Sequence, residues 1–330
     1  MSIVKTASLV SRRRIIALGA GLAAAASQGI LPTTASGSSA YAASFGGDGG
    51  VSFSPPPEET IKDIEKIVGA QGKVSNQIYS IGLDRNDITD VTLKGVPIKP
   101  SFQIGGGLYF QQNADGTVTM NSDMALKAGE LDGFIRQLVA HEIVFQAEHQ
   151  HLYDYTPMVW YIHFRATGDA KRIAKGVKAA LSATSTPFPQ KSAKQPTTTL
   201  PAEEMGKILG AKPTIHEGGV VKFSVPRAEQ VVLGGVKVSP YLNIDAPLAF
   251  QPHGGGQNAA AVPDFAMIAS EINPVVGLMQ KQGWDIGCLY NQETDEQPQL
   301  YFSHQFKTGD ALQLAKEIRA GLNLTNSKFK

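Results

Sequence analysis

The sequence predicts an α+β fold made of two tandem homologous repeats, each a largely antiparallel sheet with helices packed on one face. The main observation is internal repetition, because residues 163–181 and 304–322 are identical at nine of nineteen positions, at a fixed offset of 141 residues. Strand-like segments and amphipathic helices follow one another without regular alternation, which favours an antiparallel sheet. The composition, 42% hydrophobic and 18% charged, is typical of a folded globular protein.

The first 42 residues have the layout of a signal peptide. A basic run, Arg12, Arg13 and Arg14, precedes an apolar stretch at 15–26, and a polar segment follows that ends at the expected cleavage point, Ala42. The string SRRRII resembles a twin-arginine signal. We therefore expect export by the twin-arginine route to the periplasm or the medium. Residues 43–57, rich in Gly, Ser and Pro, are expected to form a flexible linker.

Charge and cysteine content narrow the range of partners. The whole chain carries +1, but residues 1–42 hold four basic and no acidic residues, which leaves 26 basic against 29 acidic residues after cleavage. This balance gives no reason to expect binding to nucleic acid or to an anionic membrane. Cys288 is the single cysteine, so we expect neither an internal disulfide nor a lipid anchor at the cleavage point, and no stable membrane anchor.

The first repeat is expected over residues 57–183. It begins with an amphipathic helix at 59–70 that Gly69 closes. Four strand-like segments follow, around 77–84, 90–98, 106–113 and 117–124. A second helix at 129–142 precedes two histidine-bearing strands. The last helix, at 168–181, has Asp169 as its N-cap.

The second repeat is expected to have a similar order of elements over residues 198–323. Residues 183–201, rich in Pro, Ser, Thr and Lys, are expected to link the repeats. Residues 324–330 form a short tail.

Three of the seven histidines lie within fifteen positions, in a segment that is expected to form a β-hairpin centred near Pro157. Side chains two apart on a strand share a face, so His149 and His151 point the same way. The expected register places His151 opposite His163, so the three imidazoles share one face. We expect them to bind zinc, copper or iron with one open coordination position. The alternatives are a polar pocket without metal and histidines with a purely structural role.

Three further residues are candidates for the same site. Glu130 recurs as Glu271 at a helix start, where a carboxylate stabilises the helix dipole, and its alternative role is a fourth ligand or general base. Tyr155 is expected in the hairpin turn, where it borders an opening. Arg165 has the strand parity of His163, so it is a candidate to bind an anionic substrate or to form an ordinary ion pair.

The duplicated layout, the helix start ELDGF and the segments HQHL, TPMVWYIHF and TGDA resemble the LppY/LpqO family of bacterial exported proteins. The resemblance covers nearly the whole chain after the signal peptide, and it implies export without implying a particular reaction. Gln150 stands where the family has Asn. The second repeat has Tyr290 and Gln292 in place of His149 and His151, so the first repeat is expected to carry the site.

The leading hypothesis is therefore a soluble exported protein that binds a metal ion or a small ligand on its first repeat. A metal-dependent enzyme is one alternative, in which the open coordination position activates water or oxygen and Glu130 or Tyr155 assists proton transfer. An envelope interaction protein with structural histidines is the other.

Overall fold

The structure is a computed structural model that describes residues 52–190 and 196–330. The predicted signal peptide, most of the first linker and part of the second lie outside these residues. None of the helices within 52–190 and 196–330 is long and apolar enough to cross a membrane.

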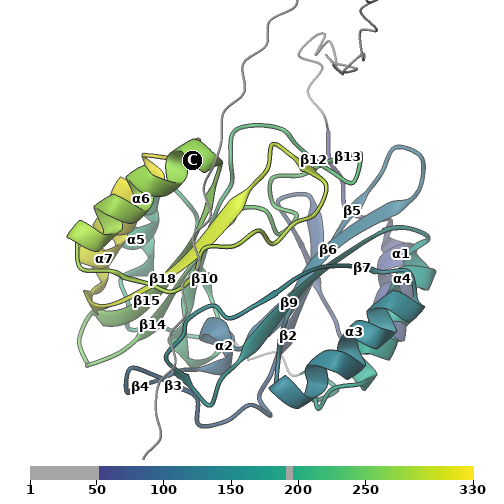
Figure 1. Cartoon of the computed structure of the whole chain (residues 1–330), viewed down its shortest axis with the longest axis horizontal. Helices are drawn as coiled ribbons and strands as arrows, with labels where there is room; N and C mark the ends of the chain where they lie inside the picture. The colour runs from purple at the N-terminus through teal and green to yellow at the C-terminus, as the bar shows by residue number, and fades with distance from the viewer. Residues whose placement is uncertain (1–51, 191–195) are drawn as a thin grey trace, which may run out of the picture. The chain divides into compact units, whose positions relative to one another are not determined.

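The first repeat contains a six-stranded antiparallel sheet in the order β1-β2-β5-β6-β9-β7. The helices α1, α3 and α4 lie together on one side of it (Figure 1). Its elements are α1 (Glu58–Val68), β1 (Lys73–Ser75), β2 (Ile78–Asp84), β3 (Thr92–Leu93), β4 (Val96–Pro97), α2 (Pro100–Gln103), β5 (Gly105–Gln112), β6 (Val118–Leu126), α3 (Leu131–Ala140), β7 (Val144–His149), β8 (Tyr155–Thr156), β9 (Trp160–Gly168) and α4 (Ala170–Ser182).

The second repeat has a matching six-stranded sheet, β10-β11-β14-β15-β18-β16, accompanied by α5, α6 and α7. Its elements are α5 (Ala202–Leu209), β10 (Thr214–Ile215), β11 (Val221–Val225), β12 (Val231–Leu233), β13 (Val236–Val238), β14 (Ala246–Pro252), β15 (Asn258–Met267), α6 (Ala269–Lys281), β16 (Asp285–Ile286), β17 (Glu296–Gln297), β18 (Tyr301–Asp310) and α7 (Ala311–Leu322). The predicted fold class of two α+β repeats with antiparallel sheets is confirmed.

The same local signals shape both repeats. Asp169 caps α4 by accepting a hydrogen bond from the backbone N–H of Arg172 at 2.8 Å, and Asp310 caps α7 in the same way. Gly69 ends α1 in the left-handed conformation, with φ of 85°, and Gly210 ends α5 with φ of 68°. Equivalent sequence positions therefore start and stop equivalent helices.

The two faces of the first sheet differ in character because side chains alternate along each strand. On β9, Ile162 and Phe164 pack into the hydrophobic core beneath the helices. His163 and Arg165 lie on the opposite face, which meets the second repeat, as shown by a hydrogen bond of 3.1 Å from Asn121 Nδ2 on β6 to the carbonyl oxygen of Leu242. His163 and Arg165 thus lie where the two repeats meet.

The predicted register of the histidine strands is wrong. His163 pairs with Ala147, His149 pairs with Tyr161, and β7 ends at His149, so His151 follows the strand and does not stand opposite His163. The cause is the connection, because residues 155–156 form β8 and pair with β3 of a separate small sheet, which excludes a tight turn near Pro157. His149 and His163 nevertheless share a face, because His149 is directly opposite the residue two positions from His163.

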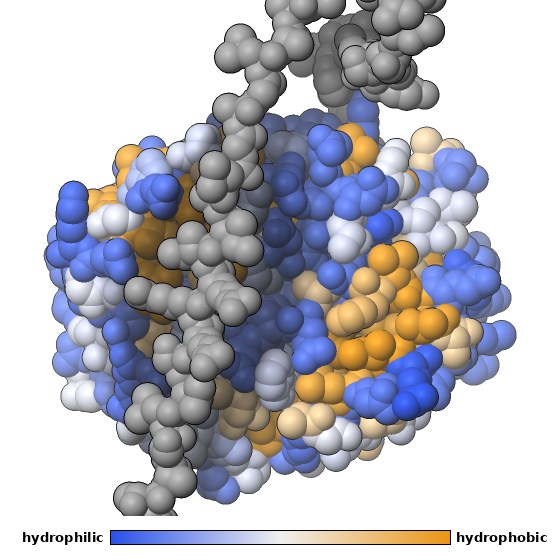
Figure 2. Space-filling model, in the orientation of Figure 1, coloured by the Kyte–Doolittle hydropathy of each residue, from blue (hydrophilic) through white to orange (hydrophobic). Residues whose placement is uncertain are grey.

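The edge strand β7 has an apolar outer surface. Figure 2 shows a hydrophobic area over the part of the first repeat where β7 lies in Figure 1. Val144 and Phe145 on this strand are 41% and 37% exposed, and Val139 at the end of α3 is 65% exposed. Among the strands of residues 52–190 and 196–330, β7 pairs with β9 only, so the strand that ends in His149 forms the border of its sheet.

Candidate metal centre

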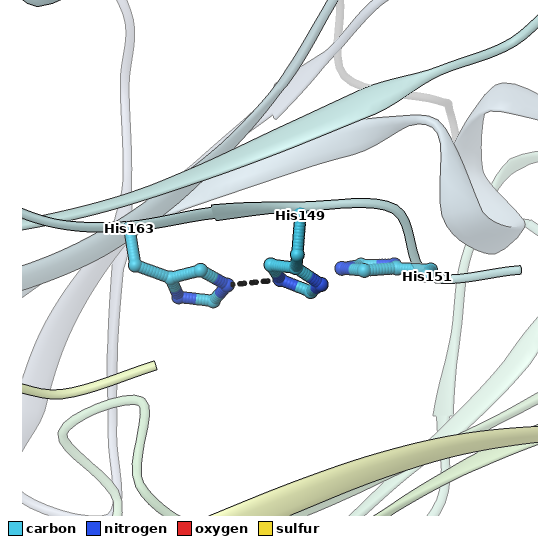
Figure 3. A group of neighbouring side chains, drawn as sticks. All are labelled: His149, His151 and His163. Carbon is cyan, nitrogen blue, oxygen red and sulfur yellow. Dashed lines mark hydrogen bonds between the residues drawn. The ribbon is translucent and has the colours of Figure 1, made fainter. Parts of the chain in front are cut away.

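The three predicted histidines lie side by side in a row, with His149 between His163 and His151 (Figure 3). His149 comes from the end of β7, His163 from β9, and His151 from the segment after β7. One ring nitrogen from each histidine lies within 4.8 Å of the other two. In residues 52–190 and 196–330, this is the one group of three or more His, Cys, Asp or Glu side chains close enough to share an ion.

The spacing of two of the three rings is close to that of two ligands on one metal ion. The Nε2 atoms of His149 and His163 lie 2.9 Å apart, a hydrogen bond in which one ring donates and the other accepts. Two nitrogens bound to one tetrahedral ion at 2.0–2.1 Å are about 3.3 Å apart, so a few tenths of an ångström separate the two arrangements. His151 Nδ1 lies 3.3 Å from Gln103 Oε1, which leaves Nε2 as the ligand atom when Nδ1 carries the proton.

Burial keeps these imidazoles neutral. It lowers the pKa of His149 to about 3, and burial together with neighbouring histidines holds the pKa of His151 and His163 well below the usual value. The buried Nδ1 atoms of His149 and His163 have no hydrogen-bond partner in the part of the chain that the structure describes. A neutral imidazole with a free lone pair is the form that binds metal ions.

The second repeat completes the surroundings of the cluster. The ring of His304 stacks on His151 with 3.6 Å between ring centroids, and Tyr290 stacks on His149 at the same distance. Asp264 Oδ2 lies 3.5 Å from His304 Nε2 and 3.4 Å from the Tyr290 hydroxyl. The site therefore lies between the repeats.

The sequence prediction included none of these three residues in the site, although His304 is the counterpart of His163 in the second repeat, and it treated Tyr290 as the loss of a ligand. The available signal was the repeat itself, since Asp264 pairs with His304 across two strands as Asp123 pairs with His163. The first repeat supplies the clustered histidines, and the second supplies an aspartate, a tyrosine and a further histidine beside them.

The structure does not bring Glu130 to the histidines. Its carboxylate accepts hydrogen bonds from the buried guanidinium of Arg85 at 2.9 Å and from the backbone N–H groups of Lys127 and Ser185 at 2.9 and 2.7 Å. The second repeat contains the same arrangement, in which Arg227 contacts Glu271. Both carboxylates lie at the start of a helix, as expected, and each also contacts a buried arginine that the sequence did not indicate.

Tyr155 is buried, 3% exposed, and so does not border an opening. It lies on β8, whose pairing with β3 draws it into a hydrophobic cluster. Arg165 is on the same face as His163 and is 8% exposed, and its Nη2 donates to the carbonyl oxygen of Thr294 at 3.3 Å.

Comparison with known proteins identifies the domain. Among curated proteins, none matches this chain. EtuB from Clostridium kluyveri, a solved structure, is 10% identical, with a match that covers 77% of this chain and 90% of EtuB and a TM-score of 0.19. The model of a domain of unknown function, DUF1259, matches residues 62–183 and again residues 203–324. The chain belongs to the DUF1259 family and contains its domain twice.

Proposed function

We propose that this is an exported metal-binding protein in which His149, His151 and His163 hold one transition metal ion. The observation that carries the proposal is the convergence of three neutral imidazoles, two of them buried, with ligand atoms within 4.8 Å of one another. An all-nitrogen donor set suits zinc, copper and iron, whereas magnesium and calcium take oxygen ligands. Three protein ligands leave a position for water or a small ligand.

Export by the twin-arginine route is part of this proposal. It is supported by the order of basic, apolar and small residues in 1–42, and by the resemblance to LppY/LpqO proteins. This route carries folded proteins, so a metal site could be filled before export. Export is tested by whether the mature protein is recovered from the periplasm in the experiment described next.

The metal content of the purified protein tests the proposal. The full precursor is produced in a bacterium with an intact twin-arginine system and is purified from the periplasm without chelators or a histidine tag. We expect about one equivalent of a single transition metal by elemental mass spectrometry, because three fixed imidazoles bind such ions tightly. The His149→Ala/His151→Ala/His163→Ala variant is expected to contain none.

A matched control removes the same number of histidines from elsewhere in the chain. His141→Ala/His216→Ala/His253→Ala changes three residues outside the cluster and is expected to keep the wild-type metal content. Sub-stoichiometric metal in the wild type that neither set of substitutions alters would refute the metal site, and would leave a polar pocket or an interaction protein.

Catalysis at the bound ion is a second candidate, favoured by Tyr290 and Asp264 beside the cluster. A buried carboxyl and a phenol next to an open coordination position can move a proton to or from a metal-bound water. In the metal-loaded protein, an enzyme requires a water ligand that exchanges with solvent, and water-proton relaxation with a paramagnetic substitute ion such as Co²⁺ or Mn²⁺ measures that exchange. If the ion had four protein ligands and no exchangeable water, metal binding without catalysis would remain as the function.

A further inference from the structure

Arg165 is a buried cation without an acidic partner. Within residues 52–190 and 196–330, no Asp or Glu carboxylate lies within 4.0 Å of its guanidinium. In the part of the chain that the structure describes, its Nη2 has one long hydrogen bond, to the Thr294 carbonyl oxygen, and its Nε has no partner. The other deeply buried arginines, Arg85 and Arg227, each contact two carboxylates. Arg165 is thus an exception to the way that this protein buries its charges.

An uncompensated guanidinium away from water is costly. Transfer of a charge out of water is offset only by an opposite charge with good geometry, and arginine stays protonated at any pH that a protein tolerates. A neutral carbonyl at 3.3 Å offsets little of that cost. The position therefore favours a negatively charged group from outside the protein.

One acidic side chain near Arg165, Glu293, forms its hydrogen bonds with other residues. Its Oε1 accepts from Asn121 Nδ2 at 2.8 Å and from Gln292 Nε2 at 3.2 Å, and its Oε2 accepts from Gln146 Nε2 at 2.5 Å. Asn121 pairs with Arg165 across β6 and β9, so the amides that hold Glu293 are neighbours of the arginine. Side-chain amides therefore hold the carboxyl of Glu293, and it does not contact Arg165.

The second repeat is shaped around the guanidinium. Gly234, in the turn between β12 and β13, has a φ of 57°, and a Cβ atom there would lie 2.1 Å from Arg165 Nη1. No other residue than glycine fits that contact without displacing the arginine. The guanidinium therefore packs closely against the backbone of this turn, which carries no charge.

We propose that Arg165 binds the anionic group of a small molecule, a carboxylate, sulfate or phosphate, where the two repeats meet. The planar fork of the guanidinium offers paired N–H donors to two oxygens of such a group. His163 is two residues away on the same strand and face, so a bound anion lies next to the candidate metal centre. The proposal rests on the lack of an acidic partner and holds whether or not the ion is bound.

Thermal unfolding at constant ionic strength tests this site. Sodium chloride is the reference, and sodium sulfate, sodium phosphate and sodium succinate are the probes. At least one probe is expected to raise the Tm of the wild type in a saturable way, because a ligand that binds only the folded state stabilises it. Arg165→Met is expected to lose that shift completely, and its own Tm in chloride is expected to equal or exceed that of the wild type.

Two further variants keep the result interpretable. Arg165→Lys retains the charge without the planar guanidinium and is expected to weaken anion binding at least tenfold. If Arg165→Met does not fold, this variant is the test of the anion site. Arg172→Met, at an exposed arginine, is expected to keep the whole shift.

The proposal is overturned if no probe raises the wild-type Tm beyond the chloride reference, or if the shift persists in both Arg165 variants. Metal content measured on the same samples is expected to be unchanged by Arg165→Met. Failure of the anion site and failure of the metal site are therefore separate outcomes.

Discussion

Glu130→Ala is expected to lower the free energy of unfolding by about 3–5 kcal/mol, since it leaves part of the charge of a buried arginine uncompensated. Arg85 is fully buried, and its Nη2 contacts both oxygens of Glu130 at 2.9 Å. Hydrogen bonds from two backbone N–H groups and from Arg85 hold the pKa of Glu130 below its usual value, although burial alone would raise it. Urea unfolding at neutral pH measures the change.

A surface pair on the adjacent helix is the matched control for this measurement. Asp132 contacts Arg136 at 2.9 Å, but both side chains are more than 70% exposed. Asp132→Ala is therefore expected to cost less than about 1 kcal/mol. If Glu130→Ala cost no more than this control, the buried pair would contribute little to stability, and a role for Glu130 in function would have to be reconsidered. Metal content in Glu130→Ala is expected to stay at the wild-type value.

The metal-free protein is expected to lose stability on acidification through its clustered histidines. Burial lowers their pKa in the folded state, so below the ordinary value of 6.5 the unfolded chain takes up protons that the folded cluster does not. Their contribution is present above pH 6.5 and falls as the pH drops, down to about pH 3 for His149. Each histidine contributes a slope of about 1.4 kcal/mol per pH unit in that window.

The comparison must be between variants because buried carboxyls act in the opposite direction. Burial raises the pKa of Asp264 and raises that of Glu293 to about 7, and these groups stabilise the folded state as they take up protons. Denaturant unfolding from pH 7 to pH 4, with the metal removed, is therefore compared for wild type and the triple alanine variant of the cluster. If the free energy of unfolding changed with pH by the same slope in the two proteins, the histidines would be taking up protons as readily in the folded state as in the unfolded chain.

The sequence was sufficient to predict features that depend on local order. The end of α1 at Gly69 follows from the conformational preference of glycine, and the start of α4 at Asp169 follows from side-chain capping. The strands follow from the alternation of apolar and polar residues. The repeat at a fixed offset predicted the two matching sheets. Each of these signals is either a local pattern of a few residues or the repeat within the sequence.

Features that depend on distant contacts were not predictable. The register of β7 against β9 is set by β8 pairing with β3, and residues 92–93 lie some sixty positions earlier. The residues beside the cluster come from the second repeat, whose packing against the first leaves no periodic pattern in the sequence. His149 and His163 share a face in spite of the wrong register because the face of a strand depends only on parity, whereas His151 lies beyond the end of β7.

The edge position of β7 has a consequence for how the site opens. Within the described residues this strand is hydrogen-bonded on one side only, to β9, and it ends in His149. Segments with few partners have the lowest local free energies of opening, so β7 is expected to fray before the central strands do. An ion that joins His149 to His163 ties the free end of β7 to β9. Amide hydrogen exchange along residues 144–149 would then be slowed by the metal, while exchange in the central strand β6 would change little.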